Sequence, residues 1–354
     1  MKRILAVNPG ATSTKLAVYE NERAIYKKII EHQGNDLMQF ARVFDQYGYR
    51  LGLILEALEE AEISPDTLDA VVGRGGLLKP VSSGTYAVNE LMLDELEKAE
   101  RGEHASNLGA VIADCFAKKF GIPAFIVDPV SVDEMEPEAR ISGMPDLPRV
   151  SMSHALNSKA VARKVAKEIG KCYEEVNLVV AHLGTGVSVS PHRKGRMIDV
   201  NNAQEEGPFS PDRCGGLPAR ALVKLCCSGK YTEDEMLKRV SGSGGMVAYL
   251  GTRDVREAEK RAAEGDRLAD IVLNAMAYQA AKEIGAMSAV LCGDVDRIIL
   301  TGGIAYSKRI VDAITSRVEF IAPVVVVPGE EELESLAAGA LRVIMGEEEL
   351  LAFQ

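Results

Sequence analysis

The chain has 354 residues, of which 47% are hydrophobic and 26% are charged, and its net charge is −11. This length favours two domains over a single hydrophobic core. The acidic balance argues against a nucleic-acid surface, which needs a broad basic face, but a few local arginines and lysines suffice for one anionic ligand.

The sequence shows no signal for export or for a membrane span. Its first apolar run ends at Asn8-Pro9, too early for a signal peptide, and no apolar run approaches the roughly 18 residues of a membrane helix. The six cysteines have no metal-binding spacing and are typical of reduced thiols in a cytosolic protein. We therefore expect a soluble, cytoplasmic protein without nucleic-acid or membrane partners.

The first half of the chain alternates short apolar runs with longer amphipathic ones. In order, they predict a two-stranded hairpin, a helix, a strand, two helices and a strand (residues 4–28, 36–63, 68–76, 88–121 and 122–130). A proline-rich stretch without periodicity, residues 131–149, predicts a connecting loop.

The second half begins with a helix, residues 158–170, and then repeats the N-terminal theme. Over residues 176–200, the run "LVVAHLGTGVSVS" matches "ILAVNPGATSTKLAV" about 174 positions earlier, with an apolar strand, a Gly-Thr/Ser turn and an alternating strand. The remaining segments predict three helices, a strand–turn–helix unit and a final strand with an alanine-rich helix (residues 215–229, 241–266, 267–293, 295–314 and 320–344).

The repeated hairpin predicts a duplicated α/β fold. We place a first domain at residues 1–149 and a second, nucleotide-binding domain at residues 150–330. We expect the C-terminal helix within residues 331–354 to pack back on the first domain.

Three glycine-containing turns follow apolar strands: "NPGATSTK", "HLGTGVSVS" and "LTGGIA". Backbone N–H groups of such turns form anion-binding concavities, and glycine lets the main chain approach a phosphate closely. None has the spacing of a P-loop or a dinucleotide-binding turn, and a single turn of this kind is usually only a turn. Three of them in one chain favour nucleotide phosphate binding.

Charged and histidine side chains lie next to these strand ends. Arg74 and Arg213 lie in glycine-rich surroundings and suit a carboxylate or phosphate, with a surface salt bridge as the alternative. His182 ends a strand before a phosphate-type turn, whereas His104 lies where a helix breaks. Asp128 ends a strand and has three interpretations: a metal ligand, a base or a cap of the following loop.

The run "PGEEELES" has two interpretations as well. Glutamates in the first turn of a helix stabilise its dipole, and a glutamate at the same place can reach a Mg²⁺-bound water. The sequence alone does not choose between them.

In this order, the motifs "NPGATSTK", "VGRGG", "EHASN", "IVD", "HLGTG", "DVR" and "TGGI" resemble those of the acetate and butyrate kinases, within the sugar kinase/Hsp70/actin superfamily. The resemblance spans nearly the whole chain and rests on the combination of motifs. It implies an α/β fold of two duplicated domains of the actin-like ATPase (ribonuclease H-like) type, with a nucleotide cleft between them. It also implies reversible, ATP-dependent and Mg²⁺-dependent phosphorylation of a short-chain carboxylate to an acyl phosphate, in a homodimer or larger homo-oligomer.

The resemblance also assigns roles by motif. The residues expected at the reacting groups are Asn8, Arg74, His104, Asp128 and Arg213. Those expected to bind ATP or ADP are Ser13, Lys15, His182, Gly184, Thr185, Gly186, Asp254, Arg256, Gly302 and Gly303. Asp128 and Glu331 are expected to serve Mg²⁺, with the register among Glu330, Glu331 and Glu332 open.

Two departures from the family's pattern concern the substrate and the role of one histidine. Gly75-Gly76 replaces bulkier residues of acetate kinases beside Arg74, which suits a longer acyl chain and favours butyrate or a branched short-chain acid. A single His154 stands where acetate kinases have two nearby histidines, which leaves its role open. The alternatives are an acetate or propionate kinase, a sugar or polyol kinase with Asp128 as base, and an actin/Hsp70-like ATP switch.

Overall fold

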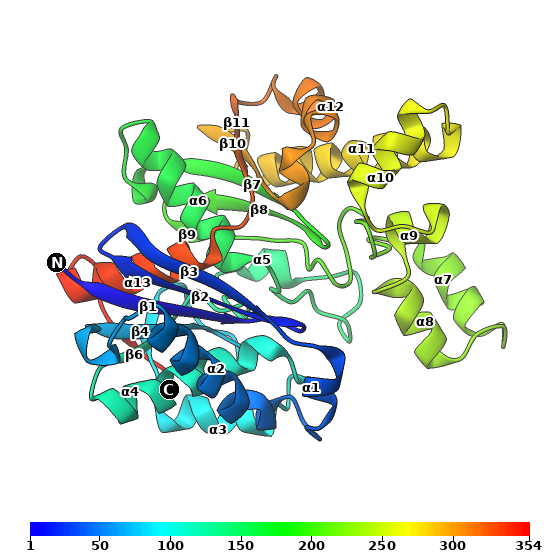
Figure 1. Cartoon of the computed structure of the whole chain (residues 1–354). Helices are drawn as coiled ribbons and strands as arrows, with labels where there is room; N and C mark the ends of the chain where they lie inside the picture. Colours follow the sequence, from blue (N-terminus) through cyan, green and yellow to red (C-terminus); the bar gives the residue numbers. More distant parts are fainter. The chain divides into compact units, whose positions relative to one another are not determined.

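Two units make up the computed structural model, which describes residues 1–354 apart from the side chains at positions 34 and 35 (Figure 1). Unit 1 comprises Met1–Asp133 and Glu331–Gln354, and unit 2 comprises Glu134–Glu330. Residues 134–149, which the sequence analysis placed with the first domain, thus belong to unit 2.

Unit 1 contains a seven-stranded sheet in the order β12-β5-β6-β4-β1-β2-β3. Its strands are β1 (Arg3–Pro9), β2 (Ser13–Glu20), β3 (Arg23–Glu31), β4 (Ala70–Arg74), β5 (Thr85–Ala87), β6 (Ala124–Val127) and β12 (Leu351–Ala352). β1 pairs antiparallel with β2 and parallel with β4, which pairs parallel with β6. The opening segment thus forms three strands instead of two, because residues 23–31 alternate exposed and half-buried side chains along an edge.

The helices of unit 1 cover both faces of this sheet. They are α1 (Gly34–Met38), α2 (Tyr47–Glu60), α3 (Glu90–Lys98), α4 (Leu108–Phe120) and α13 (Glu332–Met345), with 3₁₀ turns at Phe44–Gln46, Pro65–Thr67 and Ala105–Asn107. Leu5 and Val7 of β1 pack with α2 and α4 on one face, and α13 packs against β1, β4 and β6. The predicted break between α3 and α4 is confirmed, whereas the helix expected from residue 36 begins as α2 only at Tyr47.

Unit 2 contains a five-stranded sheet in the order β11-β10-β7-β8-β9. Its strands are β7 (Asn177–Leu183), β8 (Val187–Arg193), β9 (Arg196–Met197), β10 (Arg297–Gly302) and β11 (Val324–Pro328). β7 pairs antiparallel with β8 and parallel with β10, which pairs parallel with β11. This is the pairing of β1, β2, β4 and β6, so the predicted duplication of the hairpin is confirmed in the topology.

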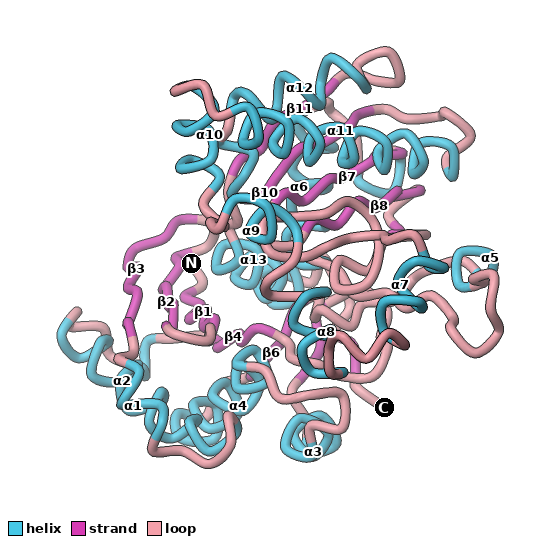
Figure 2. The backbone as a smooth tube through the Cα atoms, turned by 90° about the vertical axis from the view of Figure 1, so that its right-hand side faces the viewer, coloured by secondary structure: helices cyan, strands magenta, loops and turns pink.

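The helices of unit 2 are α5 (Pro137–Arg140), α6 (Ala155–Glu168), α7 (Ala219–Cys226), α8 (Glu233–Val240), α9 (Gly245–Leu250), α10 (Val255–Ala263), α11 (Arg267–Val290) and α12 (Lys308–Val318), with 3₁₀ turns at Tyr173–Glu175 and Gly303–Tyr306. Figure 2 shows α11 and α12 side by side, and they pack on one face of the sheet. α6 packs on the other face. Among the described residues, no helix combines the length and the apolar character needed to cross a bilayer.

Candidate active site

Three side chains of unit 1 meet where two parallel strands end. Asn8 lies near the end of β1, Arg74 ends the neighbouring strand β4, and Glu332 begins α13. The amide of Asn8 donates to one carboxylate oxygen of Glu332, and the guanidinium of Arg74 pairs with the other. Because carboxyl ends of parallel strands share one edge of a sheet, this fold brings together residues far apart in sequence.

The Asn8 side chain is buried, and one of its polar atoms lacks a partner. Its Oδ1 makes no hydrogen bond within the described residues. Leaving a buried acceptor unsatisfied costs about 1–3 kcal/mol. This oxygen can therefore accept a hydrogen bond from a ligand or coordinate a cation.

The three consecutive glutamates have three different surroundings. Glu330 Oε1 lies 2.8 Å from His182 Nε2 in unit 2. Glu331 is the N-terminal cap residue of α13, and its carbonyl accepts a hydrogen bond from Ser335 Oγ at 2.8 Å. The carboxylate beside Asn8 and Arg74 is that of Glu332, one position after the predicted Glu331.

Asp128 follows β6 with φ 37°, in the left-handed region that a residue with a Cβ rarely adopts. Its Oδ1 accepts hydrogen bonds from Ser83 Oγ at 2.6 Å and from the Gly84 N–H at 2.9 Å. These partners precede β5 in the chain and do not belong to the loop that follows Asp128, so its role as a metal ligand, a base or a cap of that loop stays a prediction. Backbone strain of about 1–3 kcal/mol at such a residue is typical of functional sites.

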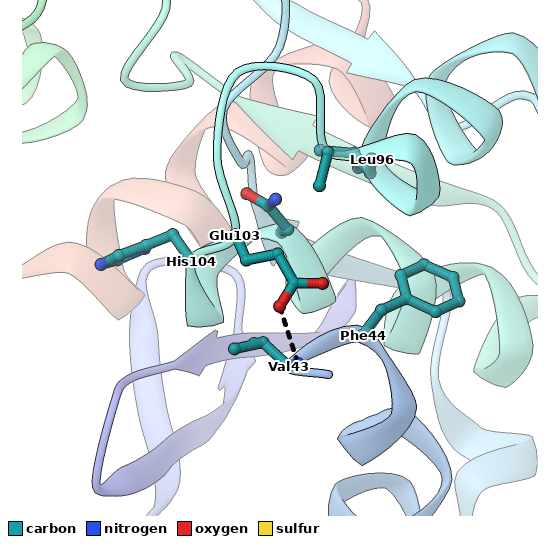
Figure 3. A pocket seen from close by; sticks show the side chains of 7 residues that line it. Val43, Phe44, Leu96, Glu103 and His104 are labelled. Carbon is teal, nitrogen blue, oxygen red and sulfur yellow. Dashed lines mark hydrogen bonds between the residues drawn. The ribbon is translucent and has the colours of Figure 1, made fainter. Parts of the chain in front are cut away.

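His104 caps the 3₁₀ turn at Ala105–Asn107. Its Nδ1 lies 2.8 Å from Ser106 Oγ and accepts a hydrogen bond from the Ser106 N–H at 3.2 Å. Loss of hydration and then the positive charge of Arg74 lower the pKa of His104. Figure 3 shows the ring turned away from the small hollow beside it, where Glu103 accepts a hydrogen bond from the Val43 N–H.

The turn between β1 and β2 is stabilised by hydrogen bonds within unit 1. Lys15 lies opposite Asn8 in the antiparallel ladder, and its exposed side chain therefore shares the Asn8 face. Ser13 is half-buried, and its carbonyl accepts from the Gly10 N–H at 2.7 Å. The buried guanidinium of Arg50 also bonds to this turn, a contact that the sequence analysis missed.

In unit 2, His182 is buried at the end of β7, before the turn of Gly184, Thr185 and Gly186. Its Nδ1 lies 2.9 Å from Asn157 Oδ1, and its ring stacks on that of His154 at 3.8 Å between centroids. The contact between its Nε2 and Glu330 lacks hydrogen-bond geometry.

Arg213, from a later loop of unit 2, packs against this turn. A Cβ added to Gly186 would lie 2.1 Å from Arg213 Nη1, so the guanidinium rests directly on the glycine. Nη1 also donates to the Ala203 carbonyl at 3.2 Å. Burial lowers the pKa of Arg213, partly opposed by Asp212. The Thr185 carbonyl accepts a hydrogen bond from Ser210 Oγ, which ties the turn to the loop of Arg213.

The remaining predicted ATP-binding positions lie at two further places in unit 2. Asp254 caps the N-terminus of α10, and Arg256 donates to it from Nε at 3.0 Å and Nη2 at 2.7 Å. Hydrogen bonds from Arg256 lower the pKa of Asp254 to about 2. Gly302 ends β10 with φ 88°, whereas Gly303 is exposed and open on its Cβ side.

The comparison with known proteins decides the family. The model of the acetokinase family matches residues 150–331. The chain is also 53% identical to Butyrate kinase 1 of Clostridium acetobutylicum over 349 residues, 98% of each chain. The chain belongs to the acetokinase family.

A second relative agrees with this membership of the acetokinase family, and a solved structure shows the fold. Butyrate kinase 2 of the same organism is 53% identical over 348 residues, again 98% of each chain. The crystal structure of Porphyromonas gingivalis acetate kinase aligns with a TM-score of 0.81 at 18% identity, over 98% of this chain and 100% of that chain. The predicted α/β fold of duplicated, actin-like ATPase type is therefore confirmed.

One expectation about this acetokinase chain is not supported by the geometry. The glycines after Arg74 were expected to leave room for a longer acyl chain. A Cβ at Gly75 would lie 2.5 Å from Pro129 Cβ, and one at Gly76 would lie 2.5 Å from Asn107 Oδ1. The protein's own side chains fill this space, so these glycines serve packing and carry no argument for acyl chain length.

Proposed function

We propose that this acetokinase transfers the γ-phosphoryl group of ATP to the carboxylate of butyrate or a branched short-chain acid, giving an acyl phosphate and ADP, and catalyses the reverse reaction. The observation that carries the proposal is the 53% identity to two butyrate kinases over nearly the full length. The cluster of Asn8, Arg74 and Glu332 supports it chemically, because it offers donors and a cation at a strand edge.

The acceptor requires no base, because a short-chain carboxylate is already ionised at neutral pH. A carboxylate oxygen attacks the γ-phosphorus in line, a new P–O bond forms, and the bond to the β-phosphate oxygen breaks as ADP leaves. The enzyme's task is to align two anions and to neutralise charge in the transition state. We assign this task to Arg74 and Arg213, with His104 lining the site and Asp128 next to the acceptor.

Magnesium fits the oxygen donors of unit 1. The unpartnered Asn8 Oδ1 and the Glu332 carboxylate are hard oxygen ligands, and Mg²⁺ is usually held by one or two carboxylates together with substrate phosphates and waters. In the described part of the chain, no three His, Cys, Asp or Glu side chains are grouped so as to hold a metal ion. We assign Glu332, with Asp128, to this role. Bound Mg²⁺ would neutralise phosphate charge.

Most of the residues that we assign to ATP binding lie in or beside turns that follow strands. We propose that the turn of Gly184, Thr185 and Gly186, next to His182, faces the ATP phosphates, together with Ser13 and Lys15 of unit 1. The exposed Gly303, next to Gly302, leaves its surroundings open for a nucleotide. Asp254 and Arg256 lie at the surface in an ion pair, and we propose that they contact the adenosine.

The decisive experiment is acyl hydroxamate formation from ATP, Mg²⁺, hydroxylamine and a series of acids. We expect kcat/KM to be highest for butyrate or isobutyrate, with acetate and propionate as the competing acids. No product with any acid of two to five carbons would refute the proposal. A sugar or polyol accepted better than every acid would point to a hydroxyl kinase, and ATP hydrolysis stimulated by a protein without any acid would point to a switch.

We further propose a homo-oligomer, supported by helix α7. None of its residues is buried, although it carries apolar side chains such as Val223, which is 61% exposed. Cationic Lys224 and the acidic first turn of α8 are complementary charges for a second copy. Val223→Glu should reduce the mass measured by light scattering, whereas Lys230→Glu, in the loop before α8, should change it less; an unchanged mass for Val223→Glu would exclude this face.

A cytoplasmic location is also part of the proposal. All six cysteines are free thiols in the structure. Unpaired cysteines are typical of proteins in reducing compartments. Fractionation of the source cells, with the acid kinase activity as the marker, tests this location.

A further inference from the structure

Arg50 of α2 places a guanidinium beneath the turn between β1 and β2. Its side chain is fully buried. Nη1 donates to the carbonyl of Gly10 at 3.0 Å, to that of Ser13 at 3.2 Å and to Thr14 Oγ1 at 2.9 Å. Nε and Nη2 both donate to Gln46 Oε1, at 3.2 and 2.8 Å.

Every one of these acceptors is neutral. No carboxylate pairs with Arg50 in the part of the chain that the structure describes, and burial lowers the pKa of its guanidinium to about 10, so it stays protonated at neutral pH. A buried charge without a counter-ion is strongly destabilising. An anion bound at the far side of the turn would compensate for part of this cost.

The geometry places Arg50 on the opposite face of the hairpin from the reacting groups. Thr14 shares its face of β2 with Leu16, which packs against α2. Asn8 and Lys15 share the other face, where Asn8 contacts Glu332. Arg50 therefore acts on a ligand of that face through the turn and its charge, without touching the ligand.

The orientation of the turn follows from peptide planarity. In a trans peptide the C=O and the next N–H point in opposite directions, and no peptide bond of the described chain is cis. Because the Gly10 carbonyl points to Arg50, the Ala11 N–H points away from it. Ala11 and Thr12 are exposed, so this N–H faces the open side of the turn.

We propose that Arg50 is a positioning residue for phosphoryl transfer: it pins the carbonyls of Gly10 and Ser13, directs the Ala11 N–H toward the phosphoryl group, and supplies a buried positive charge behind it. The inference rests on the proposed function, because it takes the first turn as the place where the phosphoryl group binds. His32 supports the arrangement, with its Nε2 2.9 Å from Thr14 Oγ1.

The test compares Arg50→Lys and Arg50→Ala with Ile54→Val, a conservative change on the same buried stripe of α2. Lysine keeps the charge but loses the planar guanidinium, which binds the turn through Nη1 and Gln46 through Nε and Nη2 at the same time. We expect kcat to fall about 10²-fold in Arg50→Ala, because a misplacement of ~1 Å costs that much. Arg50→Lys should recover part of this loss, with the KM for butyrate nearly unchanged. Ile54→Val should keep full kcat while losing some thermal stability.

A second readout separates this inference from the acid kinase assignment. The rise in melting temperature caused by ATP, or by inorganic phosphate alone, should be smaller in Arg50→Lys than in wild type. A wild type without activity on any acid would refute the proposed function and still allow this comparison. Wild-type kcat in Arg50→Lys, or wild-type stabilisation by both anions, overturns the inference. So does a failure of both Arg50 variants to fold, which would make Arg50 purely structural.

Discussion

Gly186→Ala is expected to reduce activity by displacing the side chain of Arg213. The new Cβ would lie 2.1 Å from Arg213 Nη1 and 2.9 Å from its Cζ. Because ordinary contact begins near 3.4 Å, the guanidinium must retreat by about 1.3 Å. A displacement of this size at a group that neutralises transition-state charge costs about 10²-fold in kcat, or ~2.7 kcal/mol.

Stability should hardly change in this variant. The clash involves the end of a flexible side chain, and Gly186 does not have a positive φ. We expect the free energy of unfolding to stay within about 1 kcal/mol of wild type. Gly285→Ala on α11, with no atom near its new Cβ, is the matched control and should keep full activity.

The assay is hydroxamate formation at saturating ATP and butyrate, with urea unfolding alongside it. Arg213→Ala should lose about 10²–10³-fold, as removal of one charge-stabilising group does. If Gly186→Ala acts by moving Arg213, the double variant should be no worse than Arg213→Ala alone. Losses that add in the double variant, or a Gly186→Ala enzyme within twofold of wild type, would refute the reasoning.

The other predictions concern the proposed metal ligand Glu332, the loss of stability at acidic pH, and the backbone at Gly302. Glu332→Gln should lower kcat and the apparent affinity for Mg²⁺ far more than Glu331→Gln, and the opposite order would return the metal role to Glu331. Burial, then Lys159 and Arg163, hold the pKa of His192 well below 6.5. As the pH falls below 6.5, the unfolded chain therefore takes up this proton before the folded chain does. The free energy of unfolding then falls by about 1.4 kcal/mol per pH unit. Measured by urea unfolding from pH 7 to 5, this dependence on pH should be weaker in His192→Gln. Gly302→Ala would bring a Cβ to 2.4 Å from the Leu183 carbonyl at φ 88°, so its unfolding free energy should drop by more than about 2 kcal/mol, and an unchanged melting temperature would contradict this.

The sequence predicted the features that repeat or that match family motifs. The two hairpins could be recognised because the same turn chemistry occurs twice, and Asn8 and Arg74 were expected at one site because their motifs resemble those of the acetate and butyrate kinases. The register of the glutamates could not be predicted, since it depends on where α13 begins. Its first residue is Glu332, and that start decides which carboxylate meets Arg74.

Two missed features had a signal in the sequence. Arg50 falls on the buried stripe of α2 with Ile54, Ala57 and Leu58, and a charged residue at such a position indicates a buried polar contact. The start of α8 carries a Thr-x-x-Glu capping box at Thr232, which marks a helix N-terminus. The role of Gly75 and Gly76 had no such signal, because only the fold shows that Pro129 and Asn107 occupy the space beside them.

The division of the chain has a consequence for biosynthesis. Unit 2 is continuous, whereas the sheet of unit 1 receives α13 and β12 only from Glu331–Gln354. A ribosome therefore delivers all of unit 2 before the helix that covers the β1 face carrying Asn8. Until then that face lacks its cover, and such exposed apolar surface is where aggregation and chaperone binding begin. Strands β1 and β2 thus leave the ribosome before the helix that covers them, and nascent chains stalled before residue 331 should bind chaperones through these strands.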